Sequence, residues 1–204
     1  MKISILIPTI PSRESSLNNL LKILLPQMST FTSSKDYDNN ITILKYHNFD
    51  VEIIVCSDEK KITTGEKRNC LLKIAKGKYV IYIDDDDEVP NYYINELKKA
   101  CDLDSDCFAI NGKMTTDGQK EIKWRLSKDY DNITIKENGV DVYLRKTNHI
   151  TGVKRELALL APFPNKSNAE DKGYSDALNP FLKTEYKIEL PMYHYKFSTK
   201  NKEY

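Results

Sequence analysis

A run of apolar residues that ends in consecutive acids, KYVIYIDDDDEVP at residues 78–90, constrains the fold of this chain more than any other stretch. Tyr79 to Ile83 are all β-branched or aromatic, which is typical of a buried strand in an α/β sheet. Asp84 to Asp87 and Glu88 follow directly. Open α/β sheets bind their ligands at the carboxyl ends of their strands, so the acids mark a candidate binding site.

The acids favour a divalent metal site. Two carboxylates about 4 Å apart repel each other by about 1 kcal/mol in water and about 4 kcal/mol near a protein surface. A cation removes this repulsion, and carboxylate oxygens are the hard ligands that such cations prefer. A solvated acidic turn is the alternative interpretation of an acid run. The apolar strand immediately before the acids favours the metal site.

Composition sets broad limits on the protein class. The 204 residues suit one domain, and a net charge of +1 gives no general electrostatic reason to bind nucleic acid or a membrane. The cysteines lack metal-site spacing and are expected to be reduced thiols: Cys56, Cys70, Cys101 and Cys107. No apolar run approaches the roughly 20 residues that span a bilayer. We expect a cytoplasmic protein without a membrane partner, in the host cytoplasm if the source is viral.

The first half of the chain alternates between predicted strands and helices. Strands are expected at residues 3–7, 51–56 and 79–83, and helices at 17–25, from Thr63 to Lys76, and from Pro90 onward. Residues 29–50, rich in Ser, Thr, Asp and Asn, are predicted to be a loop or mobile insertion. This order predicts an α/β fold with a mostly parallel central sheet and helices on both faces.

After residue 106 the pattern predicts a smaller antiparallel or irregular C-terminal part. A strand is expected at residues 107–110, followed by hairpins around Asp117-Gly118 and Asn138-Gly139. A helix is expected from Asn168 and should end or kink at Pro180. Residues 186–190 are predicted to form a last strand, and the Lys-rich tail is expected to be loose.

Several segments in order, SILIPT, VEIIVCSD, GEKRN and AKGKYVIYIDDDD, with Glu170-Asp171 further on, resemble the family 2 glycosyltransferases with the GT-A fold. The resemblance covers roughly residues 2–195 and extends to small members encoded by phages and large viruses. It implies an enzyme that moves a sugar from a nucleotide sugar, with a UDP-sugar expected, to an acceptor hydroxyl with inversion. Residues 1–112 would form the donor-binding half and 113–204 the acceptor-side half of one domain.

The same resemblance assigns roles to the acids. Asp84, as the first acid of a D-x-D motif, would hydrogen-bond the ribose, and Asp86 would ligate Mn²⁺ or Mg²⁺ beside the pyrophosphate leaving group. Asp85 and Asp87 leave this register open by one residue, and Asp85 is also assigned to the donor site.

Other residues of the donor site follow from the strand ends. Pro8 and Thr9 after the first strand and Asp58 after the second would line the base pocket. Typical members of the resembled family carry two acids after the second strand, where this chain has Ser57-Asp58. Arg68 would face the base or the pyrophosphate, and a salt bridge on the helix surface is its alternative role.

Catalytic and further metal-binding residues are also implied. Glu170-Asp171 resembles the pair that supplies the general base in inverting members, with Asp171 as the base. Acids in the first turn of a helix also complement its dipole, which is the structural alternative. His194 is placed to be a third metal ligand and His149 is a second choice, although a packed histidine would look the same.

The acceptor is expected to be a glycan, a protein or a small molecule, with modified DNA a less favoured choice. Basic residues that could form a rim for DNA are Lys113, Lys120, Lys123, Arg125, Lys128, Arg145, Lys146, Lys154 and Arg155. Trp124 and Tyr130 lie among them, and an extruded base needs such a surface to stack on. The net charge of +1 argues against DNA.

Three other functions fit parts of the pattern. A haloacid-dehalogenase-like phosphatase also has D-x-D after a buried strand, but it needs Thr or Val where this chain has Glu88. A sugar nucleotidyltransferase needs a Gly-rich loop after the first strand, and PTIPSR has no glycine. A non-catalytic nucleotide-sugar or carbohydrate-binding module would keep the fold without turnover.

Overall fold

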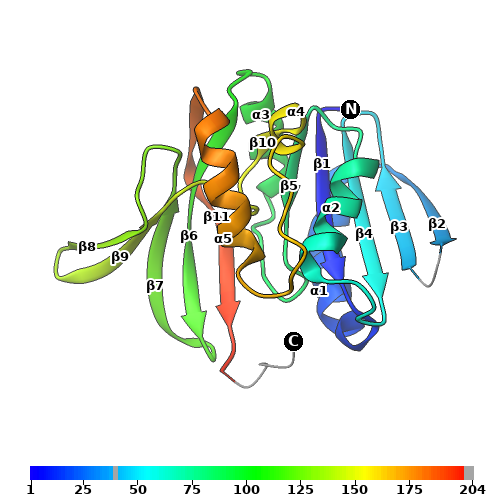
Figure 1. Ribbon diagram of the computed structural model, residues 1–204, viewed down its shortest axis with the longest axis horizontal. Coiled ribbons are helices and arrows are strands. Elements are labelled where there is room, and N and C mark those ends of the chain that lie inside the picture. Colours follow the sequence, from blue (N-terminus) through cyan, green and yellow to red (C-terminus); the bar gives the residue numbers. More distant parts are fainter. Residues whose placement is uncertain (39–40, 200–204) are drawn as a thin grey trace.

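A computed structural model describes residues 1–38 and 41–199 (Figure 1). The strands are β1 (Ile3–Thr9), β2 (Thr32–Asp38), β3 (Ile41–His47), β4 (Val51–Asp58), β5 (Tyr79–Tyr82), β6 (Cys107–Thr116), β7 (Gln119–Leu126), β8 (Ile133–Glu137), β9 (Val140–Arg145), β10 (Val153–Lys154) and β11 (Glu185–Phe197). The α-helices are α1 (Glu14–Leu24), α2 (Thr64–Ile74), α3 (Tyr93–Cys101), α4 (Arg155–Ala158) and α5 (Glu170–Leu178). Short 3-10 helices are η1 (Pro11–Arg13), η2 (Leu25–Met28) and η3 (Asn179–Phe181).

All strands belong to one sheet in the order β2-β3-β4-β1-β5-β10-β6-β7-β9-β8, and β11 pairs with β6 beside this path. The centre is parallel, because β1 pairs in parallel with both β4 and β5. β10 runs antiparallel to β5 and to β6, and β6 and β7 form an antiparallel hairpin. The predicted α/β sheet is therefore confirmed. Its C-terminal part is mixed, because β11 pairs in parallel with β6 and β7 pairs in parallel with β9.

Helices cover both faces of the sheet, as Figure 1 shows. Alternate residues of the central strands point to opposite sides, so each face presents its own apolar set. On one face, Ile3, Ile5 and Ile7 of β1 share a core with leucines of α1 and with α3. On the other face, Leu6 of β1 lies in a core with residues of α2, α4 and α5. No helix in residues 1–38 and 41–199 is long and apolar enough to cross a membrane.

Residues 29–50 do not form the predicted loop. They contain a hairpin, β2–β3, whose second strand pairs antiparallel with β4 at the edge of the sheet. Ile41 and Ile43 pack on one core and Leu44 and Tyr46 on the other. The side chains of residues 32–37 in β2 are exposed, which explains the polar composition of this strand.

Local capping and turn predictions agree with the structure. The Thr63 side chain accepts a hydrogen bond from the Glu66 N–H (3.1 Å) at the start of α2. The turns at residues 117–118 and 138–139 join β6 to β7 and β8 to β9. The helix expected from Asn168 begins instead at Glu170, after Ala169 adopts a left-handed conformation (φ 54°). η3, which contains Pro180, follows this helix.

The last strand is much longer than predicted and reaches the functional edge of the sheet. β11 runs parallel to β6 with irregular register near Pro191. Its distal part also meets the acidic turn after β5, since Glu88 and His194 form a pair of reciprocal backbone hydrogen bonds (3.1 and 2.8 Å). The C-terminal strand therefore holds the acidic turn in place through backbone hydrogen bonds. The Lys-rich tail beyond residue 199 lies outside the described residues.

Candidate active site

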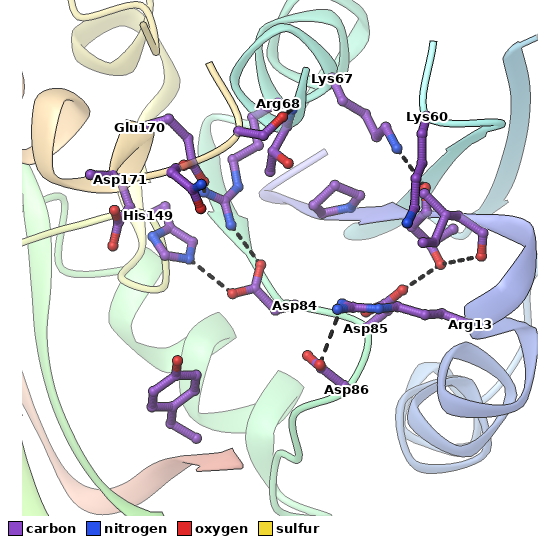
Figure 2. A pocket seen from close by; sticks show the side chains of 18 of the residues that line it. Arg13, Lys60, Lys67, Arg68, Asp84, Asp85, Asp86, His149, Glu170 and Asp171 are labelled. Carbon is purple, nitrogen blue, oxygen red and sulfur yellow. Dashed lines mark hydrogen bonds and ion pairs between the residues drawn. The ribbon is translucent and has the colours of Figure 1, made fainter. Parts of the chain in front are cut away.

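A cavity of about 550 Å³ opens at the carboxyl ends of the central parallel strands (Figure 2). Its walls come from the ends of β1 and β5, the N-terminal turns of α2 and α5, and the end of β11. Eight residues predicted to form the site line it: Pro8, Thr9, Arg68, Asp84, Asp85, Asp86, Glu170 and Asp171. Residues from opposite ends of the sequence thus meet where parallel strands end.

The acidic turn presents its side chains alternately. The side chains of Asp84 and Asp86 are 28% and 34% exposed, whereas Asp85 and Asp87 are only 1% and 3% exposed. The Asp87 N–H donates to the Asp84 carbonyl (3.1 Å), which closes the turn. Asp84 and Asp86 are therefore the more exposed pair of the turn.

Both carboxylate oxygens of Asp84 are held by cationic or polar partners. Arg68 Nη2 donates to Oδ1 (2.6 Å), and His149 Nε2 lies 3.3 Å from Oδ2. Burial by itself raises the pKa of Asp84, but Arg68 and His149 outweigh it and hold the pKa well below its ordinary value. Asp84 is therefore a fixed anion.

Asp85 and Asp86 share one cation. Arg13 Nη1 lies 3.0 Å from Asp85 Oδ1 and 3.3 Å from Asp86 Oδ2. The other oxygen of Asp85 accepts a hydrogen bond from the Thr9 hydroxyl (2.5 Å). Burial raises the pKa of Asp85 to about 6 and also raises the pKa of Asp86, despite the opposing effect of Arg13.

Asp87 points away from the cavity and joins the turn to β11. It accepts hydrogen bonds from the Tyr193 hydroxyl (2.7 Å) and from the Lys196 N–H (2.8 Å). The same Tyr193 oxygen accepts from the Asp84 N–H (3.2 Å). Burial, together with the charge of Asp84, raises the pKa of Asp87 well above its ordinary value. Asp87 is a structural residue of the turn.

Glu170 and Asp171 at the start of α5 have different surroundings. Glu170 is buried, and its Oε1 accepts a hydrogen bond from Arg68 Nη1 (2.5 Å). Arg68 thereby joins Glu170 to Asp84, and burial of this guanidinium is offset by the two carboxylates, which raise its pKa. Asp171 is half-buried, lines the cavity and accepts a hydrogen bond from the Lys172 N–H (2.8 Å). Both line the cavity, but Glu170 is buried against Arg68 whereas Asp171 is only half-buried.

The N-terminus of α5 is held against α2 by close packing. Phe163 stacks on Tyr174 with the ring centroids 4.1 Å apart, and the Arg68 guanidinium lies 5.5 Å from the Phe163 ring. Gly65 at the start of α2 donates its N–H to the Lys166 carbonyl (3.0 Å). A Cβ at Gly65 would lie 2.0 Å from the Pro164 carbonyl oxygen, so only glycine permits this approach.

Asp58 does not line the cavity, contrary to the prediction. Its carboxylate is 2% exposed and pairs with Lys67. Its Oδ2 also accepts hydrogen bonds from the backbone N–H groups of Lys61 (2.6 Å) and Ile62 (3.1 Å). Lys67 in turn donates to the Thr9 carbonyl (2.7 Å). Asp58 thus holds the wall of the cavity, where Lys60 and Ile62 provide the lining.

Of the two histidines considered as metal ligands, His149 lines the cavity and His194 does not. His194 does not line the cavity: its Nε2 lies 2.9 Å from the Thr115 hydroxyl and its Nδ1 lies 3.4 Å from Glu88. The structure therefore does not bring His194 to Asp86 as a third metal ligand. His149 is buried, lines the cavity and contacts Asp84.

The acids fit a metal ion only in a limited way. In the part of the chain that the structure describes, no three His, Cys, Asp or Glu side chains gather as a ready-made metal cage. The carboxylates of Asp84, Asp85 and Asp87 each have both oxygens engaged. Asp86 faces the cavity and meets only the 3.3 Å contact from Arg13 among the described ion pairs. Mg²⁺ is commonly bound by one or two carboxylates together with substrate phosphates, and Asp86 suits that kind of binding.

Four of the basic residues that could form a rim for DNA are paired with acids: Lys113 with Glu121, Arg125 with Glu137, Lys128 with Asp129, and Lys154 with Asp104 and Asp106. Trp124 is 6% exposed and packs in the core. The expectation that Trp124 offers a stacking surface for an extruded base is therefore wrong.

Sequence reasoning missed several residues that line the cavity or touch its acids. Arg13 follows the first strand in PTIPSR, and its position one turn after that strand was an available signal. Lys67 is adjacent to Arg68, but its buried contact with Asp58 has no local signature. Tyr195, Lys196 and Phe197 also line the cavity, and only the pairing of β11 brings them there.

The comparisons with known proteins agree on the fold. Among curated proteins, no sequence matches this chain. The crystal structure of S. aureus TarS 1-349 superposes on this chain with a TM-score of 0.64 at 16% sequence identity. The match covers 96% of this chain and 60% of the TarS chain. The complex of the same protein with UDP-GlcNAc gives 0.62 at 15% identity, covering 96% of this chain and 58% of its own. The complex with UDP has a TM-score of 0.58 at 15% sequence identity, and the match covers 97% of this chain and 61% of the TarS chain. The present chain thus spans about 60% of the length of TarS 1-349.

The sequence profile described as Glycosyl transferase family 2 matches residues 32–158, which is well over half of the 204 residues. This stretch contains the strand that ends in the acids, the helix that carries Arg68, and the segment with His149. The match decides against a haloacid-dehalogenase-like phosphatase. The chain belongs to glycosyl transferase family 2.

Proposed function

We propose that this chain transfers a sugar from a UDP-sugar to an acceptor hydroxyl, with inversion at the anomeric carbon. The observation that carries the proposal is one cavity lined both by the exposed acids of the turn, Asp84 and Asp86, and by Asp171 at the start of α5. A donor bound at the strand ends would present its sugar toward α5. The choice of uridine is supported by the structures of S. aureus TarS in complex with UDP-GlcNAc and with UDP.

The donor site is built from residues that are already held in place. Asp84, fixed by Arg68 and His149, is suited to accept hydrogen bonds from donor hydroxyls. Pro8 and Thr9 form the wall at the end of β1, where the base would lie. Asp84 and Thr9 are already fixed by hydrogen bonds, and such preorganisation lowers the entropic cost of association.

Asp86 would hold Mn²⁺ or Mg²⁺ together with the donor's pyrophosphate. When bound, such a cation neutralises the charge that develops on the departing nucleoside diphosphate. Asp86 is the aspartate of the turn with the most exposed side chain, and it has no tight partner. The chain's own contribution is to offer this carboxylate on a turn that Asp87, Tyr193 and Lys196 hold in place.

Asp171 would act as the general base. It lines the cavity on α5, across from the acidic turn (Figure 2). In an inverting displacement the base removes the proton of the acceptor hydroxyl while the leaving group departs on the opposite face. Glu170 cannot take this role as placed, because its carboxylate is buried against Arg68. Glu170 instead positions Arg68, and through it Asp84.

The direct test is release of UDP from a panel of UDP-sugars with Mn²⁺, by wild type, Asp86→Asn and the distant exposed variant Asp129→Asn. We expect release by wild type and Asp129→Asn, and loss of the Mn²⁺-dependent part in Asp86→Asn. The anomeric configuration of a transferred or hydrolysed sugar, read by NMR, tests inversion.

Three outcomes contradict all or part of the proposal. If no UDP-sugar binds, with or without Mn²⁺, the cavity is not a donor site. If a UDP-sugar binds tightly but no UDP is released with any acceptor class, the alternative of a non-catalytic binding module is supported. A retained anomeric configuration would reject the single displacement alone.

A further inference from the structure

Arg13 reaches the acidic turn from the other side of the cavity. It ends η1, the short 3-10 helix directly after β1, and its guanidinium extends to the turn after β5. One nitrogen, Nη1, contacts two adjacent carboxylates, at 3.0 Å from Asp85 and 3.3 Å from Asp86. The Arg13 guanidinium therefore occupies the position between two carboxylates to which a metal cation would also be attracted.

The bridge has an electrostatic reason. Asp85 is 1% exposed and cannot be neutralised by solvent, and Asp86 adds a second charge beside it. Like charges at such short range repel strongly when partly buried. Arg13 offsets this repulsion in a chain without a bound ion. Thr9 fixes the other Asp85 oxygen, so the pair of acids presents a constant arrangement.

The two arginines of the site differ in how firmly they are held. Arg68 is 4% exposed and has hydrogen bonds of 2.6 and 2.5 Å to its two carboxylates. The Arg13 side chain is 34% exposed, and η1 contains no buried residue. Its contact with Asp86 is an ion pair at 3.3 Å, whereas its hydrogen bond goes to Asp85. Arg13 can therefore leave Asp86 without disturbing the core, and Arg68 cannot leave Asp84 so easily.

We infer that Arg13 is a place-holding cation that a divalent metal ion displaces from Asp86 when the donor binds. The inference rests on the proposed function, because it assumes that Asp86 receives the metal. It makes Arg13 a positioning residue that controls when the metal binds. The empty site resists Mn²⁺, since the ion must compete with a charge that is already present.

The donor relieves this competition. Its pyrophosphate brings negative charge, and a guanidinium pairs with phosphate oxygens through charge-assisted hydrogen bonds. UDP would therefore draw Arg13 away from Asp86 and also supply oxygen ligands to the ion. By linkage, UDP and Mn²⁺ should each tighten the binding of the other, and Arg13 should carry part of that coupling.

The experiment measures Mn²⁺ affinity by calorimetry and by the EPR signal of free Mn²⁺, without nucleotide and with saturating UDP. The variants are Arg13→Gln, Arg13→Lys and Lys60→Gln. Lys60 lines the same cavity, and no contact with Asp86 is found for it among the described ion pairs, so Lys60→Gln reports the general effect of removing a positive charge. Thermal unfolding of each variant checks that it folds.

We expect Arg13→Gln to bind Mn²⁺ alone about tenfold more tightly than wild type. Arg13→Lys, which keeps the charge, should stay near wild type, and Lys60→Gln should change the affinity less than twofold. The factor by which UDP tightens Mn²⁺ binding should be smaller in Arg13→Gln than in wild type.

The inference is overturned if Arg13→Gln binds Mn²⁺ no better than wild type, or if Lys60→Gln improves binding equally. Two further proteins, Asp86→Asn and its combination with Arg13→Gln, separate this failure from failure of the proposed metal role. If Arg13→Gln combined with Asp86→Asn still binds Mn²⁺ as Arg13→Gln does, Asp86 is not the ligand and the proposed function fails at that point. If Asp86→Asn alone abolishes binding while Arg13→Gln leaves it unchanged, only the inference about Arg13 fails.

Discussion

Glu170 and Asp171 are neighbours in the sequence, but their carboxylates have different environments. Glu170 is buried on Arg68, and Asp171 faces the cavity. Ala169, which precedes them, adopts a left-handed conformation (φ 54°) at the point where α5 starts. Such a conformation is uncommon for a residue other than glycine and is found more often at functional sites.

This difference predicts a separation of roles for Asp171. Asp171→Asn should lower turnover by a factor of about 10² to 10⁴, the usual range for a general base, with little change in UDP affinity. Asp176→Asn is the matched control, because Asp176 lies on the same helix, is exposed and pairs with Lys172. Initial rates and UDP calorimetry of both variants provide the measurement. An active Asp171→Asn together with an inactive, folded Glu170→Gln would reverse the assignment.

At this scale the sequence contained the acids but not their partners. Asp84 and Asp86 were recognisable because a buried strand followed directly by acids is a local pattern. His149 and Lys196 reach the same turn from distant parts of the chain, and no local pattern encodes that proximity, whereas the place of Arg13 just after the first strand was a usable signal. Asp58 was predicted to line the cavity because it follows a strand. It is instead buried against Lys67, behind the residues that line the cavity.

Among the elements, β11 shows why pairing partners are hard to predict. Its first residues were predicted as a strand, yet the strand continues to Phe197 and meets the acidic turn through contacts more than 100 residues apart in sequence. The hairpin β2–β3 was missed for another reason. An edge hairpin with one exposed strand needs few apolar residues, so its composition resembles that of a loop.

The contact between β11 and the turn predicts an effect of Tyr193→Phe. The change removes the hydroxyl that donates to Asp87 and accepts from the Asp84 N–H. A buried group left without its partner costs about 1–3 kcal/mol, so the free energy of unfolding should fall by that amount. UDP affinity should fall too, because the turn loses a support. Urea unfolding and UDP calorimetry measure the two effects.

Tyr92→Phe is the control for this variant, since the Tyr92 hydroxyl donates to the Pro191 carbonyl in an exposed position. We expect that variant to lose much less stability and to keep UDP affinity. Equal losses in the two variants would show that the Tyr193 hydroxyl has no special part in holding the turn.

Asp106 links β6, β10 and β11, and it gives a prediction about pH. Its Oδ2 accepts hydrogen bonds from the backbone N–H groups of Lys183 (2.9 Å) and Thr184 (3.0 Å), and Lys154 lies 3.3 Å from Oδ1. Burial by itself raises the pKa of Asp106, but these partners outweigh it and the pKa is lowered on folding. An acid whose pKa is lowered on folding stabilises the folded state above its unfolded pKa, near 3.9, and this contribution is lost as the pH falls.

Asp106→Asn should therefore cost about 1–2 kcal/mol of unfolding free energy at pH 7. The difference from wild type should shrink as the pH falls from about 5 to about 3, because protonated Asp106 resembles asparagine in charge. Urea unfolding at several pH values measures this difference. Asp104→Asn, which changes an exposed partner of Lys78 and Lys154, serves as control and should lose much less stability at pH 7, because an exposed ion pair contributes little. A difference that is constant with pH would contradict the charged role of Asp106.

For the whole molecule, the continuous sheet is the main constraint on how donor and acceptor sides relate. One sheet runs from β2 to β8, and the cavity lies where its parallel centre meets α5 and β11. The proposed donor half, residues 1–112, and acceptor-side half, residues 113–204, share this sheet through β10, which lies between β5 and β6. We therefore propose that they unfold together as one cooperative unit. The order of strands and helices predicted this architecture, whereas the place of β10 and β11 depended on long-range pairing.

A ligand that binds only the folded chain should then stabilise the whole molecule. At a concentration 100 times its Kd, a ligand adds about 2.7 kcal/mol to the free energy of unfolding. For a chain of this size that corresponds to a rise in Tm of about 5 to 10 °C. We expect UDP with Mn²⁺ to produce a single transition shifted by that amount, and UDP with EDTA or CDP with Mn²⁺ to produce less. The cavity is the reason for this expectation, since it joins β1, β5, α2, α5 and β11.

Asp86→Asn is the matched variant for this titration. It should unfold near the wild-type Tm without ligand, because Asp86 is half-exposed and outside the core. It should lose the part of the shift that Mn²⁺ adds and keep the part that UDP gives alone. Two separate transitions, with only one of them moved by UDP, would contradict the cooperative unit. A shift by CDP or GDP as large as that by UDP would contradict the assignment of uridine as the donor base.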